Sequence, residues 1–129
     1  MRRILVVDDR EEVRDLLEAT LRRGNYQIIT AGNGQEAVEV AGNRRPHVII
    51  MDVLMPGSVD GIEATRILKA DARTRDSKIL ILTGKEAGQM AEEATTAGAD
   101  AYLAKPLSPL LLLRTVDALV AQYPSGDQM

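Results

Sequence analysis

The sequence predicts an α/β domain built on one parallel β-sheet with helices on both faces. Short, strongly apolar runs, which are typical of strands buried on both faces, alternate with longer segments of helical periodicity along the 129 residues. Strict alternation of this kind requires parallel strands joined by right-handed crossovers. Neither an internal repeat nor a low-complexity linker interrupts the pattern. We therefore expect one domain over residues 1–123 and a polar tail over residues 124–129.

Five apolar runs are the predicted strands. In chain order they cover residues 4–7, 26–31, 47–51, 78–82 and 101–104. The three most apolar runs, which start at Ile4, Val48 and Ile79, are predicted to occupy the centre of the sheet. The more polar run around Ile28 is predicted to be an edge strand.

Five helices are predicted from capping residues and from apolar residues at helical spacing. They are expected at residues 13–21, 33–42, 60–68, 86–97 and 108–123. Asn33 and Glu36 form an approximate capping box for the second helix. Ser108 followed by Pro109 combines an N-cap with a first-turn proline in the last one. The apolar stripe of the first helix is expected to face the sheet and consists of Val13, Leu16, Leu17 and Leu21.

Composition and charge exclude several classes of protein. The absence of cysteine excludes a disulfide framework and thiolate metal sites. No apolar run approaches the length of a membrane span, the first residues do not form a signal peptide, and the net charge is −3. We therefore expect a cytoplasmic protein without membrane insertion. The arginine pairs at 2–3, 22–23 and 44–45 are scattered and lack aromatic neighbours, so direct binding of nucleic acid is not expected.

Polar residues follow four of the predicted strands at the point where each strand ends. Asp8 and Asp9 follow the first strand, and Asp52 follows the third. Thr83 and Lys105 follow the fourth and the fifth. Each has an ordinary explanation by itself, as a helix cap, a turn residue, a strand end or a surface cation. Because the carboxyl ends of parallel strands share one edge, where open α/β sheets bind their ligands, we expect these side chains to meet.

The residue types at this edge favour phosphoryl transfer. Three carboxylates close together repel one another, and a divalent cation among them relieves the repulsion. Ligands that are all oxygen atoms suit Mg²⁺, for which Mn²⁺ is expected to substitute. Lys105 adds a second positive charge and Thr83 a hydroxyl donor. A carboxylate nucleophile, a metal ion and a cationic donor are the equipment of phosphoryl transfer.

Five motifs that contain these residues resemble those of the receiver domain of bacterial response regulators. They are Val7-Asp8-Asp9, Asp52-x-x-Met55-Pro56, Asp60-Gly61, Thr83-Gly84 and Tyr102-x-x-Lys105-Pro106. The resemblance covers the chain to about residue 123. It implies the flavodoxin-like (βα)5 fold with strand order 2-1-3-4-5. It also implies a regulator of two-component signalling or phosphorelay rather than an enzyme, although such a domain has phosphotransfer and self-dephosphorylation chemistry of its own.

The resemblance implies a role for each residue of the site. Asp52 would accept a phosphoryl group from a sensor histidine kinase or a histidine phosphotransfer protein. Asp8, Asp9 and Asp52 would hold Mg²⁺. The backbone carbonyl of Leu54 would complete the protein ligands, and Lys105 would pair with the phosphoryl group.

The resemblance also implies a switch and a structural bond. Thr83 and Tyr102 would form a pair that changes the surface around Tyr102 and the last two helices on phosphorylation. There the protein would control a downstream partner or associate with a second copy. The peptide bond between Lys105 and Pro106 would be cis, which proline permits at small energetic cost.

Two features depart from the family pattern. Segment 56–61 is one residue longer than usual, so the loop beside the site is predicted to bulge. Leu54 and Lys85 occupy positions whose side chains influence the lifetime of the phosphoryl group in the family. A large apolar residue at position 54 would hinder an attacking water.

Three leucines of the last helix fall outside its predicted buried stripe. That stripe is satisfied by Leu112, Val116, Leu119 and Val120. Leu110, Leu111 and Leu113 are then expected near water. Single exposed leucines are common, but their clustering favours a contact surface, shared with Tyr102, for a partner or a second copy.

Alternatives remain open at this point. The chain is either a stand-alone signalling domain or the receiver of a longer regulator. Gly32-x-Gly34-x-x-Ala37 superficially fits a dinucleotide fingerprint, and flavin-binding domains share the topology, but these glycines follow a predicted edge strand. Acidic residues also occupy the place of a phosphate loop after the first strand. His47 is either a phosphohistidine donor or, as the preceding Pro46 favours, a polar residue that starts a strand.

Overall fold

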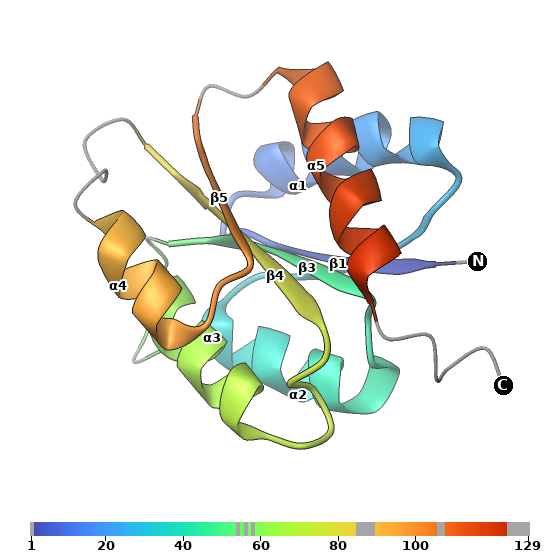
Figure 1. Cartoon of the computed structure of the whole chain (residues 1–129). Helices are drawn as coiled ribbons and strands as arrows, with labels where there is room; N and C mark the ends of the chain where they lie inside the picture. Colours follow the sequence, from blue (N-terminus) through green and yellow to red (C-terminus); the bar gives the residue numbers. More distant parts are fainter. Residues whose placement is uncertain are drawn as a thin grey trace, which may run out of the picture.

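A computed structural model describes residues 2–53, 55, 57, 59–84, 90–105 and 108–123 of the chain. Five parallel strands form one sheet in the order β2-β1-β3-β4-β5, which confirms the predicted flavodoxin-like fold (Figure 1). The strands are β1 (Arg3–Val7), β2 (Gln27–Ala31), β3 (Val48–Asp52), β4 (Lys78–Thr83) and β5 (Ala101–Ala104). The more polar β2 lies at an edge and the three most apolar strands lie inside the sheet, as predicted.

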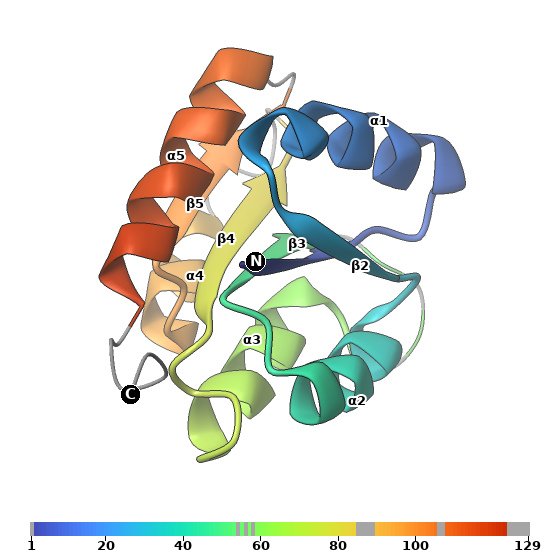
Figure 2. The ribbon, with the colours of Figure 1, turned by 90° about the vertical axis from the view of Figure 1, so that its right-hand side faces the viewer.

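Helices cover both faces of the sheet. α1 (Glu11–Leu21) and α5 (Pro109–Gln122) lie on one face (Figures 1 and 2). α2 (Gly34–Arg44), α3 (Gly61–Ala70) and α4 (Met90–Ala97) lie on the other. A short 3₁₀ turn, η1 (Arg22–Gly24), follows α1. The predicted start of the fourth helix at residue 86 and the predicted tail lie outside the described residues. In the described part, no helix is long and apolar enough to cross a membrane.

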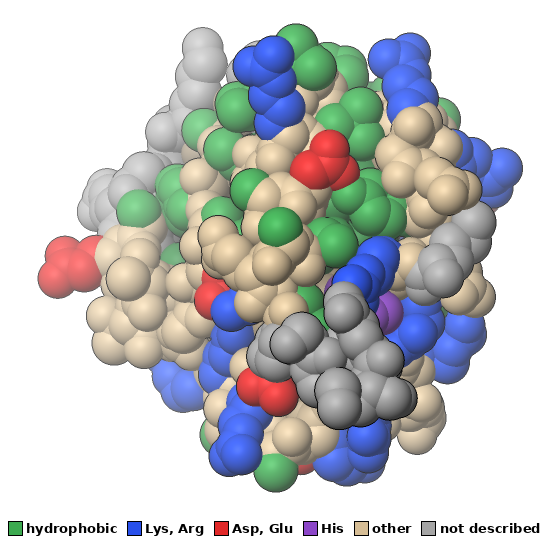
Figure 3. All heavy atoms as spheres, turned by 45° about the vertical axis from the view of Figure 1, so that its right-hand side comes forward, with side chains coloured by type: hydrophobic (Ala, Val, Ile, Leu, Met, Phe, Trp, Pro, Cys, Tyr) green, Lys and Arg blue, Asp and Glu red, His purple; other side chains and the backbone are tan. Residues whose placement is uncertain are grey.

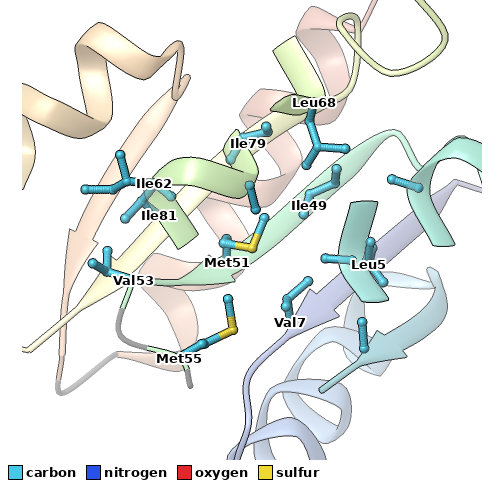
Figure 4. Close-up of a cluster of buried hydrophobic side chains, with 14 of the residues drawn as sticks. Leu5, Val7, Ile49, Met51, Val53, Met55, Ile62, Leu68, Ile79 and Ile81 are labelled. Atoms are coloured by element: carbon cyan, nitrogen blue, oxygen red, sulfur yellow. The ribbon is translucent and has the colours of Figure 1, made fainter. Parts of the chain in front are cut away.

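Two apolar layers follow from the alternation of side chains along the strands. The layer toward α2, α3 and α4 contains the strand residues Leu5, Val7, Ile49, Met51, Ile79 and Ile81 (Figure 4). The layer toward α1 and α5 contains Ile4, Val6, Val48, Ile50, Leu80 and Leu82. All twelve are at most 1% exposed. The central strands are therefore apolar at consecutive positions because both of their faces are covered.

Side chains cap two helices where the sequence predicted caps. Asn33 Oδ1 accepts a hydrogen bond from the N–H of Glu36 (2.8 Å), and the Glu36 carboxylate accepts one from the N–H of Gly32. Ser108 Oγ accepts a hydrogen bond from the N–H of Leu111 at the start of α5 (3.3 Å). Each cap satisfies a donor that the first turn of a helix leaves unpaired.

Two leucines lie differently from their predicted positions. Leu16 was expected in the buried stripe of α1, but it is 66% exposed. The buried face follows the row from Val13 through Leu17, and Leu16 lies about 100° from Leu17 around the helix. Leu113 was expected near water, but it is partly buried against the layer of α1 and α5. A helix that lies flat on a sheet also covers residues that flank its central stripe.

The end of α2 depends on a contact from another strand. The helix runs past the predicted end at Gly42 to Arg44, and Arg45 then adopts a left-handed conformation (φ 45°). The guanidinium of Arg3 donates hydrogen bonds to the carbonyls of Arg44 (2.9 Å) and Arg45 (2.8 Å). These bonds satisfy carbonyls that the end of a helix leaves without partners.

His47 has a structural role at the start of β3. Its Nδ1 accepts a hydrogen bond from the N–H of Arg3 (3.0 Å). Its ring lies 4.6 Å from the ring of Tyr123, centroid to centroid. Because the residue is only 4% exposed, the structure favours the interpretation as a strand-starting residue over that of a phosphohistidine donor.

Two glycines allow helices to approach the loop that follows β3. A Cβ atom on Gly61 would overlap the carbonyl oxygen of Asp52, and one on Gly34 would overlap the carbonyl oxygen of Val59. The N–H of Gly61 donates to the carbonyl of Val53 (3.0 Å). The start of α3 is thus attached directly to the end of β3, where only glycine leaves enough space.

We expect Gly61→Ala to lower the free energy of unfolding by about 1–3 kcal/mol, because the added methyl group must displace the backbone at Asp52. Urea denaturation would measure the change. Gly84→Ala is the matched control, because a Cβ atom there meets nothing within 4 Å, and we expect a change within about 0.5 kcal/mol. Equal stability of the two variants would contradict the close approach of α3 to β3.

Candidate functional site

The residues predicted to form a site lie together at the carboxyl edge of the sheet. Asp52 ends β3 and Thr83 ends β4, while Asp8 and Lys105 directly follow β1 and β5. Carboxylate oxygens of Asp8, Asp9 and Asp52 all lie within 4.8 Å of one another. The shared edge of the parallel strands thus brings together carboxylates that are distant in sequence.

Backbone hydrogen bonds extend the sheet into the site. The N–H of Asp8 donates to the carbonyl of Ala31 (3.2 Å), and the N–H of Lys105 donates to the carbonyl of Thr83 (2.6 Å). Both bonds lie one residue beyond the ends of the strands. The positions of the functional side chains therefore depend on the rigid sheet rather than on free loops.

Lys105 lies between two of the carboxylates. Its Nζ is 3.5 Å from Asp8 Oδ2 and 3.6 Å from Asp52 Oδ1. The lysine side chain is 24% exposed, whereas both aspartates are buried. These distances are longer than the roughly 2.8 Å of a tight charge-assisted hydrogen bond. The ammonium group offsets buried negative charge without being committed to one carboxylate.

The pKa of Asp52 is raised above its ordinary value. Burial of the carboxyl group is the main cause. The positive charge of Lys105 opposes the shift, and the negative charge of Asp8 adds to it. Arg10 and Asp9 have smaller effects, the first lowering and the second raising the pKa. A cation among the carboxylates would favour the ionised form of Asp52.

Arg10 and Arg14 belong to the site although the sequence analysis assigned neither. The N–H of Arg10 donates to Asp8 Oδ1 (2.9 Å), and its Nε lies 3.4 Å from the same oxygen. The guanidinium of Arg14 donates to the carbonyl oxygen of Asp8 (2.6 Å). Asp8 in turn raises the pKa of Arg10. The turn from Asp8 to Arg10 could have been predicted from the sequence, because an aspartate side chain often accepts a hydrogen bond from the backbone N–H two residues later.

Thr83 carries a buried hydroxyl group that has no hydrogen-bond partner in the described part of the chain. Leaving such a group unsatisfied costs about 1–3 kcal/mol. Exceptions of this kind in a folded protein call for a functional explanation. Tyr102, the other predicted switch residue, lies on the edge strand β5 and packs partly buried against the layer of α2, α3 and α4.

Three predicted features fall on residues that the structure does not describe. These are the carbonyl of Leu54, the cis bond before Pro106 and the side chain of Lys85. Within the longer loop, Gly57 has a φ of 101°, and the carbonyl of Val59 lies against Gly34. The predicted bulge of this loop stays a prediction.

A groove between α1 and α5 opens beside the site. Its volume is about 300 Å³. Apolar side chains of both helices line it, among them the exposed Leu16 of α1 and Pro109 of α5. Arg10 and Lys105 contribute to the same groove, so it connects an apolar surface with the carboxylate cluster. The sequence analysis missed this surface because it placed Leu16 in the core.

Comparison with known proteins identifies a family. Residues 4–117 match the response regulator receiver domain. The chain is 37% identical to the protein PilH of Pseudomonas aeruginosa over 121 residues, which cover 94% of this chain and 99% of PilH. It is 36% identical over 124 residues to the phosphate regulon transcriptional regulatory protein PhoB of the same organism. That match covers 96% of this chain and 54% of PhoB, so the chain spans about half the length of this relative.

Solved structures show the same likeness. The receiver domain of a sensor histidine kinase from Pseudomonas aeruginosa PAO1, with a magnesium ion coordinated in its active-site cleft, is similar with a TM-score of 0.85 and 32% identity. The match covers 93% of this chain and 98% of that one. Fold, position of the acidic cluster and sequence similarity agree: the chain belongs to the family of response regulator receiver domains.

Proposed function

We propose that the chain is a cytoplasmic phosphorelay receiver in which Asp52 accepts a phosphoryl group from the phosphohistidine of a sensor kinase or of a histidine phosphotransfer protein. The observation that carries this proposal is the cluster of Asp8, Asp9 and Asp52 within 4.8 Å, with Lys105 beside it. The role is that of a regulator and not of an enzyme. The receiver unit comprises residues 1–123.

Asp52 is the carboxylate best placed to act as the nucleophile. It ends the central strand β3, between the strands that carry Asp8 and Thr83. Arg10 forms a hydrogen bond and an ion pair with the carboxylate of Asp8. Of the two buried carboxylates, Asp52 therefore has fewer hydrogen bonds and ion pairs to give up. In the transfer, an oxygen of Asp52 bonds to phosphorus as the bond from phosphorus to the imidazole nitrogen breaks. That nitrogen keeps the electron pair, and the products are an acyl phosphate and a free imidazole.

The donor set fits Mg²⁺ or Mn²⁺. Asp8, Asp9 and Asp52 supply carboxylate oxygens within reach of one point, and the carbonyl of Leu54 is the proposed further ligand. The cluster contains no nitrogen or sulfur ligand, which favours a hard cation. When bound, such an ion neutralises charge on the carboxylates and on the phosphoryl oxygens.

Lys105 and Thr83 are proposed to bind the transferred phosphoryl group. The ammonium of Lys105 is already 3.6 Å from Asp52 Oδ1, so a small movement brings it to an oxygen of the new group. The Thr83 hydroxyl lacks a partner and ends the neighbouring strand β4. A phosphoryl oxygen would satisfy this donor, which gives phosphorylation a direct energetic effect on β4. Tyr102 on β5 is the proposed second member of the switch.

Two surfaces are proposed for partners. The phosphate donor docks at the groove of Leu16, because this groove adjoins Arg10 and Lys105 at the site. The output surface lies on α5, where Leu110 is 57% and Leu111 48% exposed. Leu113 contributes little to it, because its side chain packs partly against the core. There a downstream protein or a second copy binds next to Tyr102 and the last two helices.

The relatives support both forms of the proposal, a stand-alone domain and the receiver of a longer regulator. PilH has nearly the same length as the match, and PhoB is about twice as long. A nucleotide-binding domain is not supported. Gly34, the second glycine of the dinucleotide-like motif, lies tightly against the carbonyl of Val59, and β2 is an edge strand.

Asp9→Asn should weaken binding of Mg²⁺ about tenfold or more, because it removes an exposed carboxylate ligand without disturbing the buried ones. Calorimetric titration would measure the affinity. Asp15→Asn, an equal change of charge on α1 outside the cluster, is the control and should change little. The affinity should also fall as the pH is lowered, since the raised pKa of Asp52 makes protons effective competitors. Undiminished affinity of Asp9→Asn would remove the metal assignment.

Incubation with Mg²⁺ and a small acyl phosphate should add one phosphate, visible by intact-mass spectrometry. Asp52→Asn should abolish the addition, because the amide is not a nucleophile. Lys105→Ala should still take up phosphate but lose the change at the output surface, which the NMR shifts of Tyr102 would follow. Thr83→Val, which keeps the shape and removes the hydroxyl, should do the same. Labelling of Asp52→Asn to the level of the wild type would mean that another residue accepts the phosphate.

Glutamate substitutions should separate the two partner surfaces. Leu16→Glu should slow phosphorylation by a histidine phosphodonor protein while leaving the reaction with a small acyl phosphate unchanged. Leu110→Glu/Leu111→Glu should leave both reactions intact and abolish phosphorylation-dependent self-association or partner binding, measured by sedimentation. Ile67→Glu, which alters an exposed apolar residue of α3, is the control. If the α5 variant keeps the association of the wild type, the two leucines are ordinary surface.

A further inference from the structure

The amino edge of the sheet, opposite the phosphorylation site, is rich in arginine. Arginine pairs lie before or at the start of three neighbouring strands, and more cations follow α3 in the segment before β4. The arginines of this edge are Arg22, Arg23, Arg2, Arg3, Arg44, Arg45, Arg73 and Arg75. The sequence analysis described the pairs as scattered. In a parallel sheet, however, every strand begins at the same edge, so residues that precede different strands become neighbours.

Hydrogen bonds show that these segments lie side by side. The N–H of Gln27 donates to the carbonyl of Arg2 (2.9 Å), and that of His47 donates to the carbonyl of Arg3 (2.8 Å). The starts of β2, β1 and β3 are therefore adjacent. The guanidinium of Arg73 lies over Gly42 near the end of α2. These arginines therefore belong to segments that meet at one edge of the sheet, and together we call them the arginine stripe.

Figure 3 shows Lys and Arg side chains around the single histidine and in the lower part of the molecule, with Asp and Glu side chains among them; further Lys and Arg side chains lie at the top and right of the view. The histidine is His47 at the start of β3, which marks the amino edge of the sheet.

Part of the stripe has structural partners. Arg3 donates to the end of α2, Arg22 pairs with Glu18, and Arg73 pairs with Asp71. A cation at the end of a helix is also stabilised by the helix dipole, and α1, α2 and α3 all end at this edge. These contacts explain the presence of some cations here, but not the presence of so many.

The remaining arginines are exposed and uncommitted. Arg23, Arg44, Arg45 and Arg75 make no side-chain hydrogen bond or ion pair within the described residues. Two nearby carboxylates are already engaged by other groups: Asp100 pairs with Lys69 and Lys78, and Asp117 accepts a hydrogen bond from Tyr26. Exposed guanidinium groups without partners in the described part are available to carboxylates of a ligand.

We propose that this amino edge binds an acidic segment of a partner protein through its arginine stripe. The planar guanidinium group binds carboxylates through paired hydrogen bonds. On this surface Arg73 and Arg22 already bind carboxylates of the chain itself, at 3.0 Å and 2.5 Å. An extended segment with several Asp or Glu residues would continue these contacts along the stripe.

A nucleic acid fits the edge less well. Single strands bind through bases stacked on aromatic rings. At this edge Tyr26 donates its hydroxyl hydrogen bond to Asp117, and burial together with that bond raises its pKa. Tyr123 lies against the ring of His47. Both rings are therefore engaged within the chain, Tyr26 also by packing partly buried against the layer of α1 and α5.

An anionic membrane also fits poorly. Stable membrane contact needs apolar side chains that insert beside the cations. The large exposed apolar side chains of the described part are Leu16, Ile67, Leu110 and Leu111, all within helices rather than in the segments that form the stripe.

The stripe and the phosphorylation site can act independently. A strand of five residues is about 16 Å long at roughly 3.3 Å per residue. This distance exceeds the screening length of about 8 Å at physiological ionic strength. The carboxylates at the far edge therefore repel an acidic segment only weakly, and the proposed edge contact does not depend on Asp52.

The test uses a fluorescently labelled decaglutamate peptide and anisotropy titrations of the intact chain at physiological ionic strength, where the screening length is about 8 Å. We expect saturable binding that weakens as salt is added. Arg44→Gln/Arg75→Gln removes two uncommitted cations from the stripe and should weaken binding about tenfold. Arg66→Gln/Arg114→Gln makes the same change in net charge on α3 and α5 and should weaken it less than about twofold. Arg44→Lys/Arg75→Lys should fall between wild type and the glutamine variant.

Equal losses in the two glutamine variants would overturn the proposal, because the peptide would then respond only to net charge. Absence of saturable binding would overturn it as well. Tighter, Arg44- and Arg75-dependent binding of a single-stranded oligonucleotide or of phosphatidylserine vesicles would overturn the choice of an acidic protein segment. Urea denaturation and phosphate uptake by Asp52, unchanged in all variants, would show that folding and the phosphorylation site are unaffected.

Discussion

The repulsion among carboxylates at the carboxyl edge of the sheet is the constraint on which the site depends. Burial raises the pKa of Asp52, and the negative charge of the neighbouring Asp8 adds to the shift. The folded state therefore retains this proton to a higher pH than the unfolded chain does, so the free energy of unfolding decreases as the pH rises through that interval. Ionised Asp52 is a source of instability that Lys105 and Arg10 offset only in part. A bound cation and a phosphoryl group would change this balance, which is why the cluster suits a switch.

The two apolar layers make it possible to hold such charges. Both faces of β1, β3 and β4 are covered, so the strand ends cannot relax apart to separate Asp8 from Asp52. The close contact of Gly61 with the end of β3 attaches α3 to the same point. Against this rigid frame, the unsatisfied hydroxyl of Thr83 and the loosely held ammonium of Lys105 are the groups free to respond. The proposed switch needs both a rigid sheet, which holds the carboxylates in place, and two side chains that can move toward a bound phosphoryl group.

The two edges of the sheet have opposite electrostatic character. Strand ends carry the carboxylates, and strand starts follow helix ends where cations are favoured. Because all strands of a parallel sheet point the same way, the carboxylates gather at its carboxyl edge and the cations at its amino edge. The apolar groove between α1 and α5 and the exposed Leu110 and Leu111 lie on the helices between these edges. One small domain thereby carries chemically distinct surfaces, for which we propose a phosphate donor, an output partner and an acidic segment.

The sequence alone predicted the central strands, because apolar runs on strands covered on both faces are local patterns. The motifs around Asp8, Asp52 and Lys105 are local too, and they carried the resemblance that implied the sheet order and the residues of the site. Helix caps at Asn33 and Ser108 were predictable for the same reason. Only the tertiary structure decided that Leu16 faces outward, since the rotation of a helix depends on what it packs against. It also decided that Arg3 extends α2, because this contact joins segments whose proximity no local pattern records. The arginine stripe is the clearest case: its members are separate pairs in the chain and become one surface because parallel strands begin at a common edge.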